Sequence, residues 1–237
     1  MNPLKLEVIG RIETPFRERF GTPRQPGLIA AAQGRITFEK KFRNLDYFRG
    51  IEEFSHLWLT FVFDRVMGEY VRPLVRPPRL GGNTKVGVFA SRSPYRPNHL
   101  GLSCVAFESL ELTNDGPLLK VSGVDLTSGT PIVDIRPYIS YSDCVPQATC
   151  GFAEPGAPRR LPVKVSPGAR DSWVALLAGQ RELIEQTLAQ DPIPAFHNDP
   201  ARIYRLEISK VHVEWQKSAQ GVEIVHVSSV DDSDVHD

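Results

Sequence analysis

The sequence lacks the long apolar runs and the cysteine patterns that mark several large protein classes. No run approaches eighteen apolar residues, and the opening MNPLKLEVIG lacks the basic-then-apolar order of a signal peptide. The three cysteines, Cys104, Cys144 and Cys150, are odd in number and too widely spaced for a zinc site. We therefore expect reduced thiols, a cytoplasmic protein and no membrane partner.

The best-known catalytic signatures are also missing. There is no GxGxxG after a strand pattern, no Walker P-loop and no GxSxG elbow. The six histidines show neither HExxH nor a comparable metal-ligand spacing. These absences argue against a Rossmann cofactor site, serine-nucleophile chemistry and metal hydrolysis, and we expect no metal cofactor.

The formal net charge is zero, but the charges are unevenly distributed along the chain. Residues 1–100 carry 17 Lys and Arg against 9 Asp and Glu, whereas the remainder carries 11 against 19. Thirteen of those 17 cations are arginine, the side chain suited to phosphate contacts and base stacking. This distribution favours a basic surface on the N-terminal part that faces nucleic acid; a merely solvated charged face is the alternative.

Short strand patterns dominate the first 140 residues. In LKLEVIGRI the apolar Leu4, Leu6 and Val8 alternate with polar residues, which is typical of a half-buried strand. Turn signals such as GG, NDG and SGT separate the strands, and no helical periodicity intervenes. We expect a mainly β chain in which residues 1–150 form a closed or nearly closed barrel. The other predicted strands cover residues 34–39, 57–63, 84–90, 102–112, 118–126 and 130–139.

The composition changes after Cys150 and predicts a second, smaller unit. Residues 151–168 are rich in proline and glycine, which is typical of a linker or an extended arm. The strand patterns RIYRLEIS, VHVEW and VEIVHV come later, so residues 169–230 are predicted to form a small α+β domain, followed by an acidic tail at 231–237. Between the linker and these strands, an apolar stripe at spacings of three, four and seven predicts one amphipathic helix. The stripe is formed by Trp173, Leu176, Leu177, Leu183, Ile184 and Leu188.

The segment SRSPYRPNHLG, residues 91–101, combines rigidity with positive charge. Pro94 and Pro97 fix the backbone around Arg92 and Arg96, and Gly101 permits a close approach or a positive φ. Rigid cations beside a side-chain amide suit a carboxylate-bearing or polyanionic ligand and a base edge; a capped barrel corner is the alternative. Three further loops share this character and favour a binding site built of loops on a scaffold: PRQPG (23–27), VRPLVRPPRLGG (71–82) and DLTSGTPIVDIRPY (125–138).

Taken together, these segments resemble one family. PRQPG, EEFSHLWLTFVF, VRPPRLGGN, VGVFASRSPYRPN, GVDLTSGTPIVDIRPYI and DPIPAF are similar to the TsaA/TrmO-type tRNA methyltransferases, from about residue 4 to 228. The resemblance implies an S-adenosylmethionine-dependent enzyme with a non-Rossmann β-barrel. It further implies a homodimer that methylates N6 of threonylcarbamoyladenosine at tRNA position 37, beside the anticodon, notably in threonine tRNA.

The resemblance also implies which residues hold the cofactor, because they match the family's motifs. They come from the first proline-locked turn, the end of the FVF strand, the arginine loop and the DLTS turn. The cofactor contacts would be Gln25, Pro26, Gly27, Asp64, Arg65, Arg92, Leu102, Asp125, Leu126, Thr127 and Ser128.

The proposed reaction suggests roles for the remaining polar residues. The exocyclic amine of adenine is a poor nucleophile, and a hydrogen-bond acceptor together with an aromatic face would localise its lone pair. Asn98 offers the acceptor oxygen and Tyr138 a stacking ring, so these two are the catalytic candidates. Asn98 as a plain turn residue and Tyr138 as a core aromatic are the alternatives. The substrate-binding candidates are Arg96, Arg136, Arg76 and Arg79.

Two other functions fit the same residues. A non-enzymatic RNA-binding barrel would show salt-dependent tRNA affinity and no cofactor binding. A methyltransferase of the same fold acting on another acceptor would bind the cofactor without depending on tRNA.

Overall fold

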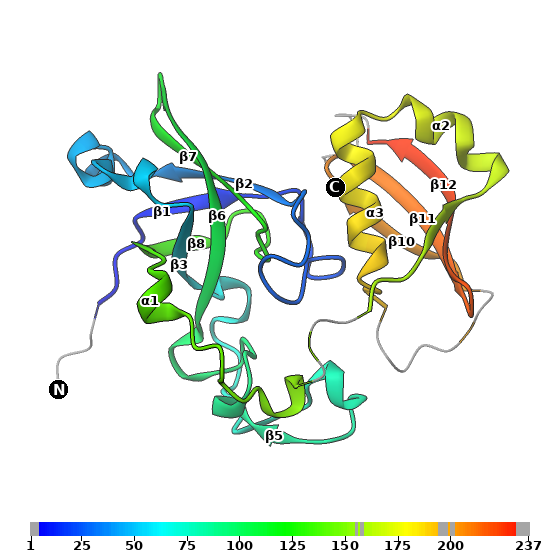
Figure 1. The fold of residues 1–237 in the computed structure, drawn as a ribbon, viewed down its shortest axis with the longest axis horizontal. Coiled ribbons are helices and arrows are strands. Elements are labelled where there is room, and N and C mark those ends of the chain that lie inside the picture. Colours follow the sequence, from blue (N-terminus) through cyan, green and yellow to red (C-terminus); the bar gives the residue numbers. More distant parts are fainter. Residues whose placement is uncertain (1–4, 155, 157–158, 194–198, 200–201, 231–237) are drawn as a thin grey trace.

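The computed structural model describes residues 5–154, 156, 159–193, 199 and 202–230. The chain forms a barrel in its first half and a sheet with two helices in its second half (Figure 1). The predicted acidic tail at 231–237 and the end of DPIPAF lie outside the described residues. Within the described part of the chain, no helix is long and apolar enough to cross a bilayer.

Six strands close the barrel in the order β1-β2-β7-β6-β3-β8, and all neighbouring pairs are antiparallel. Alternation explains the burial: Leu57, Leu59 and Phe61 of β3 point inward, while the residues between them face outward. The mainly β fold and the predicted barrel are confirmed. The strands are β1 (Gly10–Glu13), β2 (Gln33–Phe38), β3 (His56–Val62), β6 (Leu100–Thr113), β7 (Gly116–Ser122) and β8 (Pro131–Pro137).

The predicted strand at 84–90 is wrong as a barrel element. Only β5 (Val86–Gly87) forms there, and it pairs with β4 (Leu74–Val75) in a separate two-stranded ribbon. The Val88 amide still donates to the Pro73 carbonyl at the end of this ribbon, and the chain then turns through the 3-10 helix Val88–Ala90, which ends the strand. The other short helices are α1 (Ser140–Asp143) and the 3-10 turns Lys40–Phe42, Leu45–Phe48, Ile51–Glu53, Asp64–Val66, Pro78–Leu80, Pro97–His99, Gly151–Ala153 and Pro167–Ala169.

The C-terminal unit is a four-stranded sheet in the order β10-β11-β12-β9 with two helices. The predicted meander is confirmed as β10 (Tyr204–Ile208), β11 (Val211–Ser218) and β12 (Gly221–Ser229). Residues 163–165, which the sequence assigned to a linker, instead form β9 (Val163–Val165), which pairs in parallel with β12.

The predicted single helix is two helices, α2 (Arg170–Ala175) and α3 (Ala178–Ala189). Leu176 and Leu177 between them are extended, and Leu177 is 73% exposed rather than part of the apolar stripe. The Leu177 amide donates to Gln180 Oε1 at 3.1 Å, which caps the new helix start.

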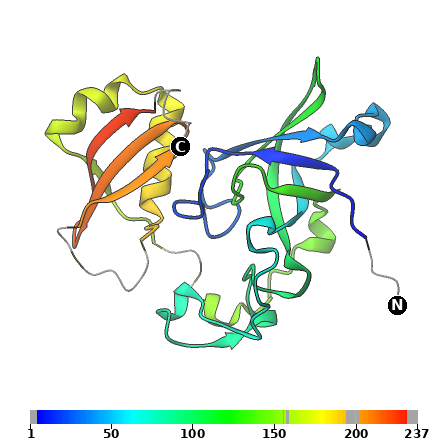
Figure 2. The ribbon, with the colours of Figure 1, turned by 180° about the vertical axis from the view of Figure 1, so that it is seen from behind.

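One long connection between two barrel strands packs against the C-terminal unit. Residues 14–32, between β1 and β2, leave the barrel and run beside α3 in both ribbon views (Figures 1 and 2). Phe16 in this segment forms an isolated antiparallel bridge with Ile208 at the end of β10. The buried side chains of barrel and C-terminal unit therefore form one continuous hydrophobic cluster.

Candidate functional site

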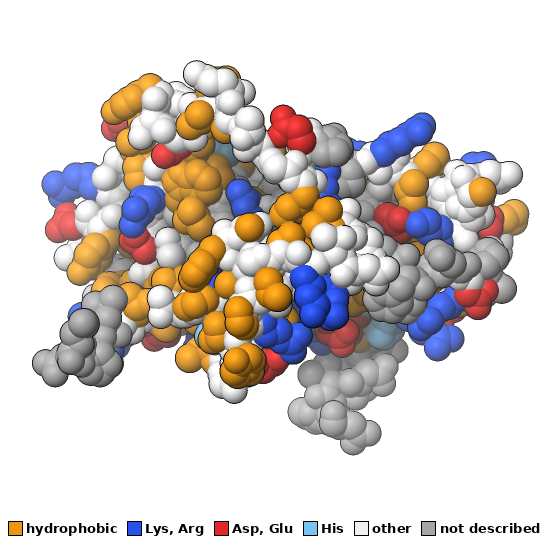
Figure 3. Space-filling model, turned by 90° about the horizontal axis from the view of Figure 1, so that it is seen from below, with side chains coloured by type: hydrophobic (Ala, Val, Ile, Leu, Met, Phe, Trp, Pro, Cys, Tyr) orange, Lys and Arg blue, Asp and Glu red, His pale blue; other side chains and the backbone are white. Residues whose placement is uncertain are grey.

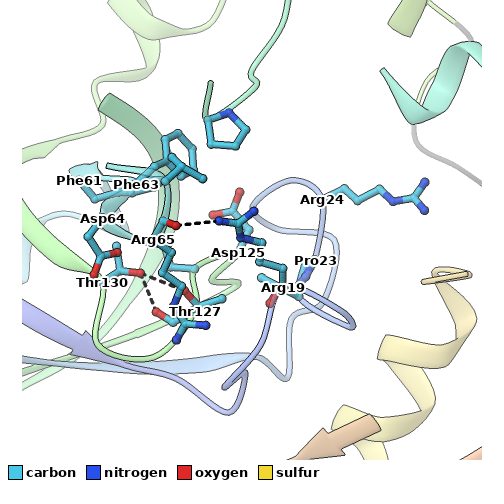
Figure 4. A pocket seen from close by; sticks show the side chains of 14 residues that line it. Arg19, Pro23, Arg24, Phe61, Phe63, Asp64, Arg65, Asp125, Thr127 and Thr130 are labelled. Carbon is cyan, nitrogen blue, oxygen red and sulfur yellow. Dashed lines mark hydrogen bonds between the residues drawn. The ribbon is translucent and has the colours of Figure 1, made fainter. Parts of the chain in front are cut away.

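A cavity of about 260 Å³ lies among the loops at one end of the barrel (Figure 4). Its walls come from residues 19–24 after β1, 61–66 at the end of β3 and 125–130 between β7 and β8. Antiparallel pairing brings these segments together, because β1, β3 and β7 all end at this rim. The lining residues are Arg19, Thr22, Pro23, Arg24, Phe61, Phe63, Asp64, Arg65, Val66, Pro94, Asp125, Leu126, Thr127 and Thr130.

Asp125 is the carboxylate with the most altered titration at this site. Burial raises its pKa from 3.8 to about 6, while the hydrogen bond from Ser103 and the charge of Arg92 act in the opposite direction. The Ser103 hydroxyl donates to Asp125 Oδ1 at 2.6 Å. Asp125 is therefore a fixed hydrogen-bond acceptor whose charge depends on pH near neutrality.

Arg65 fastens three cavity segments to one another through backbone carbonyls. Its guanidinium donates to the Arg17 carbonyl at 2.6 Å and to the Ser128 carbonyl at 3.2 Å. Its own carbonyl accepts a 3.1 Å hydrogen bond from Arg19. Arg65 thus sets the shape of the site.

Other residues in the predicted cofactor set meet beside this cavity. Gln25 accepts a hydrogen bond from Arg92, which brings the PRQPG turn against the arginine loop. The Gly27 amide donates to the Gly123 carbonyl at 2.8 Å, two residues before Asp125. The PRQPG turn therefore contacts both the arginine loop and the backbone that leads to Asp125.

Leu102 departs from this grouping. It is 53% exposed and pairs with Thr60 on the outward side of the barrel wall. Its neighbour Ser103, which the sequence analysis did not single out, is the residue that faces Asp125.

Gly101 has the close-approach role that its loop position suggested. A Cβ built there would lie 2.3 Å from Cζ of Phe61, so only glycine lets this ring take its place at the cavity.

Asn98 occupies the arginine loop in a left-handed conformation, with φ 66° and ψ −7°. Asparagine adopts this conformation more readily than most residues, which accounts for its place in the turn. His99 also has positive φ, and its Nδ1 lies 2.9 Å from the Pro94 carbonyl oxygen. The exposed Asn98 side chain makes no hydrogen bond to another described residue, so its amide is available to a ligand.

Tyr138 lies at the opposite end of the barrel from Asn98. Its amide donates to the His56 carbonyl, and its ring stands 6.0 Å from that of Trp58, whereas the Asn98 loop adjoins Val62. The six residue steps from His56 to Val62 along β3 correspond to roughly 20 Å. The two predicted catalytic residues therefore do not meet within one chain. Burial raises the pKa of the Tyr138 hydroxyl, and the nearby Cys144 adds to that effect.

The predicted substrate-binding arginines are spread over the surface rather than gathered at the cavity. Arg136 forms an ion pair with Asp134, which raises the pKa of Arg136, and Arg96 donates to the Ser91 carbonyl at 3.1 Å. Arg79 donates to the Gly156 carbonyl, and Arg76 is exposed.

The side chains that line the cavity fit S-adenosylmethionine, the cofactor that the family resemblance implies. Asp125 can accept from ribose hydroxyls, the rings of Phe61 and Phe63 offer an apolar face, and Arg19 is a cation for the amino-acid carboxylate. Phe61 and Phe63 contact each other edge-on, with ring centroids 5.0 Å apart. Among the described residues, no group of three or more His, Cys, Asp and Glu side chains could hold a metal ion.

Sequence reasoning missed several lining residues, chiefly Arg19, Thr22, Phe61, Phe63 and Thr130. Arg19 and Thr22 directly precede PRQPG in the run RERFGT, which is a polar signal next to a motif already recognised. Phe61 and Phe63 were assigned to a strand, and their role at its end could not be separated from core packing.

Comparisons with known proteins cover both units. Residues 11–144 match the family model of the tRNA-methyltransferase O N-terminal domain, and residues 158–230 match that of the TrmO C-terminal domain. A tRNA (adenine(37)-N6)-methyltransferase of Escherichia coli is 37% identical over 229 residues, which are 94% of this chain and 97% of that protein.

Two further similarities concern the cofactor and the fold. A protein of Archaeoglobus fulgidus named "Probable S-adenosyl-L-methionine-binding protein" is 35% identical over 156 residues, 66% of this chain and 40% of that one. A crystal structure of TrmO from Pseudomonas aeruginosa has a TM-score of 0.78 at 34% identity, covering 96% of this chain and 99% of that chain.

Proposed function

Because the chain belongs to the tRNA-methyltransferase O family, we propose that it methylates N6 of threonylcarbamoyladenosine at position 37 of threonine tRNA. In general terms, without naming the modified base or the tRNA, the activity is that of an S-adenosylmethionine-dependent tRNA adenine-N6 methyltransferase. Family membership removes the non-enzymatic barrel from the alternatives. The unpaired cysteines support a location in the cytoplasm.

The observation that carries the proposal is the convergence of motif residues on one cavity. Asp64, Arg65, Asp125, Leu126 and Thr127 all line it, although they come from two loops about 60 positions apart. When bound, the cofactor's sulfonium supplies the methyl group together with its own leaving group. The residues of this chain would hold the cofactor, shield it from water and fix its orientation, and such alignment can be worth several orders of magnitude in rate.

Recognition of the modified base would fall to the arginine loop. The threonylcarbamoyl group carries a carboxylate, and Arg96 uses one guanidinium nitrogen for Ser91 while its remaining N–H groups stay available. Arg92 already donates to Gln25 and lies near Asp125, which supports a role on the cofactor side. Arg76 and Arg79 on the neighbouring loop would contact the tRNA backbone.

The separation of Asn98 from Tyr138 supports a homodimer in which the partner supplies one of them. The segment from residue 67 to 89 exposes Met67, Tyr70, Leu74 and Phe89, of which Tyr70 and Phe89 are 79% and 78% exposed. Hydrophobic side chains also gather on the face seen in Figure 3, with cations between them. Exposed apolar patches of this kind mark association surfaces.

Transfer of labelled methyl from S-adenosylmethionine into total tRNA tests the proposed function. Wild-type protein should label tRNA, and Asp125→Asn should label it far more slowly because the cofactor loses a charged acceptor. Cofactor binding without any label in tRNA would instead support the alternative of another acceptor.

A further inference from the structure

We propose that the C-terminal unit positions one wall of the cofactor cavity by holding residues 15–31, with Phe20 as the central positioning residue. This inference rests on the proposed function for the identity of the cofactor. The contacts themselves are independent of it.

The beginning of the segment is fastened to the end of β10. Phe16 is fully buried and forms a bridge with Ile208, and the Ser209 amide donates to the Pro15 carbonyl at 3.2 Å. Arg17 forms an ion pair with Glu207 at 3.3 Å. The chain that leaves the barrel is therefore attached to the C-terminal sheet before it reaches the cavity.

The middle of the segment packs on the aromatic core of the C-terminal unit. The Phe20 ring is stacked on Trp215, with centroids 5.8 Å apart and planes 13° apart, and Trp215 is fully buried. Gly21 follows with φ +84°, and a Cβ there would lie 2.6 Å from Cδ1 of Leu206. Only glycine permits this approach, so the loop and the sheet fit together closely.

The end of the segment is held by side chains of α3 and its surroundings. The Leu28 carbonyl accepts from Arg160 at 3.3 Å and from Gln190 at 3.4 Å, and the Ala31 amide donates to Gln186 Oε1 at 3.1 Å. The segment is thus anchored near both ends and at its centre, each time by the C-terminal unit.

The opposite side of the same segment lines the cofactor cavity through Arg19, Thr22, Pro23 and Arg24. A second cavity of about 110 Å³ lies behind it, lined by the segment's own residues and by Thr187, Gln190 and Pro192. In Figure 4 the Arg24 side chain extends away from the cavity, and it donates to the Ile193 carbonyl at 3.5 Å. Residues 19–24 therefore separate two hollows, and their position depends on the packing of Phe20 and Gly21 against the C-terminal sheet and on the anchors at either end of the segment.

The test compares Phe20→Ala and Phe20→Leu with wild-type protein. We expect Phe20→Ala to bind S-adenosylmethionine about three- to tenfold more weakly by calorimetry, the effect of losing one aromatic pair. Its amides at 17–27 should exchange hydrogen faster in the cofactor-free protein. Phe20→Leu keeps an apolar side chain against Trp215 and should restore most of both properties.

Phe42→Ala is the matched control, because Phe42 is also a half-buried phenylalanine outside the strands whose ring contacts another aromatic ring, that of Tyr47. It should leave cofactor affinity and exchange at 17–27 unchanged.

Gln186→Ala is a second variant that removes an anchor without opening the core, and it should speed exchange near residue 31.

The outcomes separate this inference from the proposed function. Wild-type binding together with unchanged affinity and exchange in folded Phe20→Ala and Gln186→Ala would overturn the positioning role alone. A wild-type protein that binds no S-adenosylmethionine would contradict the proposed function and, with it, the cofactor side of this inference.

Discussion

The Ser103 hydroxyl donates a 2.6 Å hydrogen bond to Asp125 Oδ1 from the inward side of β6. This pair joins the barrel wall to the loop between β7 and β8, and it holds a carboxylate in the cavity that the cofactor would occupy. Burial nevertheless raises the pKa of Asp125 to about 6. Ionisation of this buried carboxyl therefore lowers the free energy of unfolding of the protein. A titratable group that is perturbed in this way inside a cavity is typical of a binding site.

The first prediction concerns stability and pH. A carboxyl with a higher pKa in the folded than in the unfolded chain favours folding at low pH, and that contribution is lost as the pH rises from 3.8 to about 6. Asp125→Asn lacks the charge, so it should be similar in stability to wild type near pH 4 and more stable well above pH 6, by up to about 3 kcal/mol at 1.36 kcal/mol for each pKa unit. Urea unfolding at both pH values measures the difference, and a pH-independent difference would contradict the assignment.

The second prediction separates the Asn98 side chain from its backbone conformation. Asn98→Gly keeps the left-handed turn at φ 66° and removes the amide. It should lower turnover by about a hundredfold while cofactor affinity stays within about twofold of wild type. Single-turnover kinetics and calorimetry give the two values. Normal turnover in Asn98→Gly would show that the Asn98 side chain has no catalytic role and that the residue serves only the turn.

The third prediction uses the distance between Asn98 and Tyr138. If one site takes each residue from a different subunit, mixing inactive Asn98→Ala and Tyr138→Ala proteins should regenerate intact sites. Random exchange of subunits should recover about a quarter of wild-type activity. Mixtures no more active than their components would show that the two residues do not share a site across subunits.

Tyr138→Phe retains the ring and should stay nearly as active as wild type if stacking is its role.

The fourth prediction concerns tRNA affinity. Arg76→Ala and Arg79→Ala should each weaken tRNA binding and reduce the dependence of log affinity on log salt by about one. Filter binding at several salt concentrations measures the slope. Arg35→Ala, which removes an exposed arginine from β2, is the matched control and should leave the slope unchanged.

Much of the fold followed from local patterns. Alternating apolar residues at 34–39 and 57–63 correspond to β2 and β3, because a half-buried strand must alternate. The apolar run at 84–90 has the composition of a strand, but it pairs with β4 in a separate ribbon and then turns at Val88–Ala90, so it does not join the barrel. The helix break at Leu177 could not be predicted from the apolar pattern either, because it depends on the hydrogen bond from the Leu177 amide to Gln180 that the structure shows.

The site was predictable in part. Proline-locked loops and family motifs led to Gln25, Arg92 and Asp125, which the structure brings together. Ser103 stood unnoticed inside a strand pattern, and only the register of β6 shows that it points inward. The placement of Tyr138 at the far end of β3 required the barrel topology, which the sequence alone does not order.

The most direct test of the central claim is mass spectrometry of nucleosides from threonine tRNA incubated with the protein and labelled S-adenosylmethionine. Two tRNA samples are needed, one carrying threonylcarbamoyladenosine at position 37 and one carrying plain adenosine. We predict one added methyl on threonylcarbamoyladenosine and none on the unmodified base. Absence of methylation on both, in protein that binds the cofactor, would contradict it.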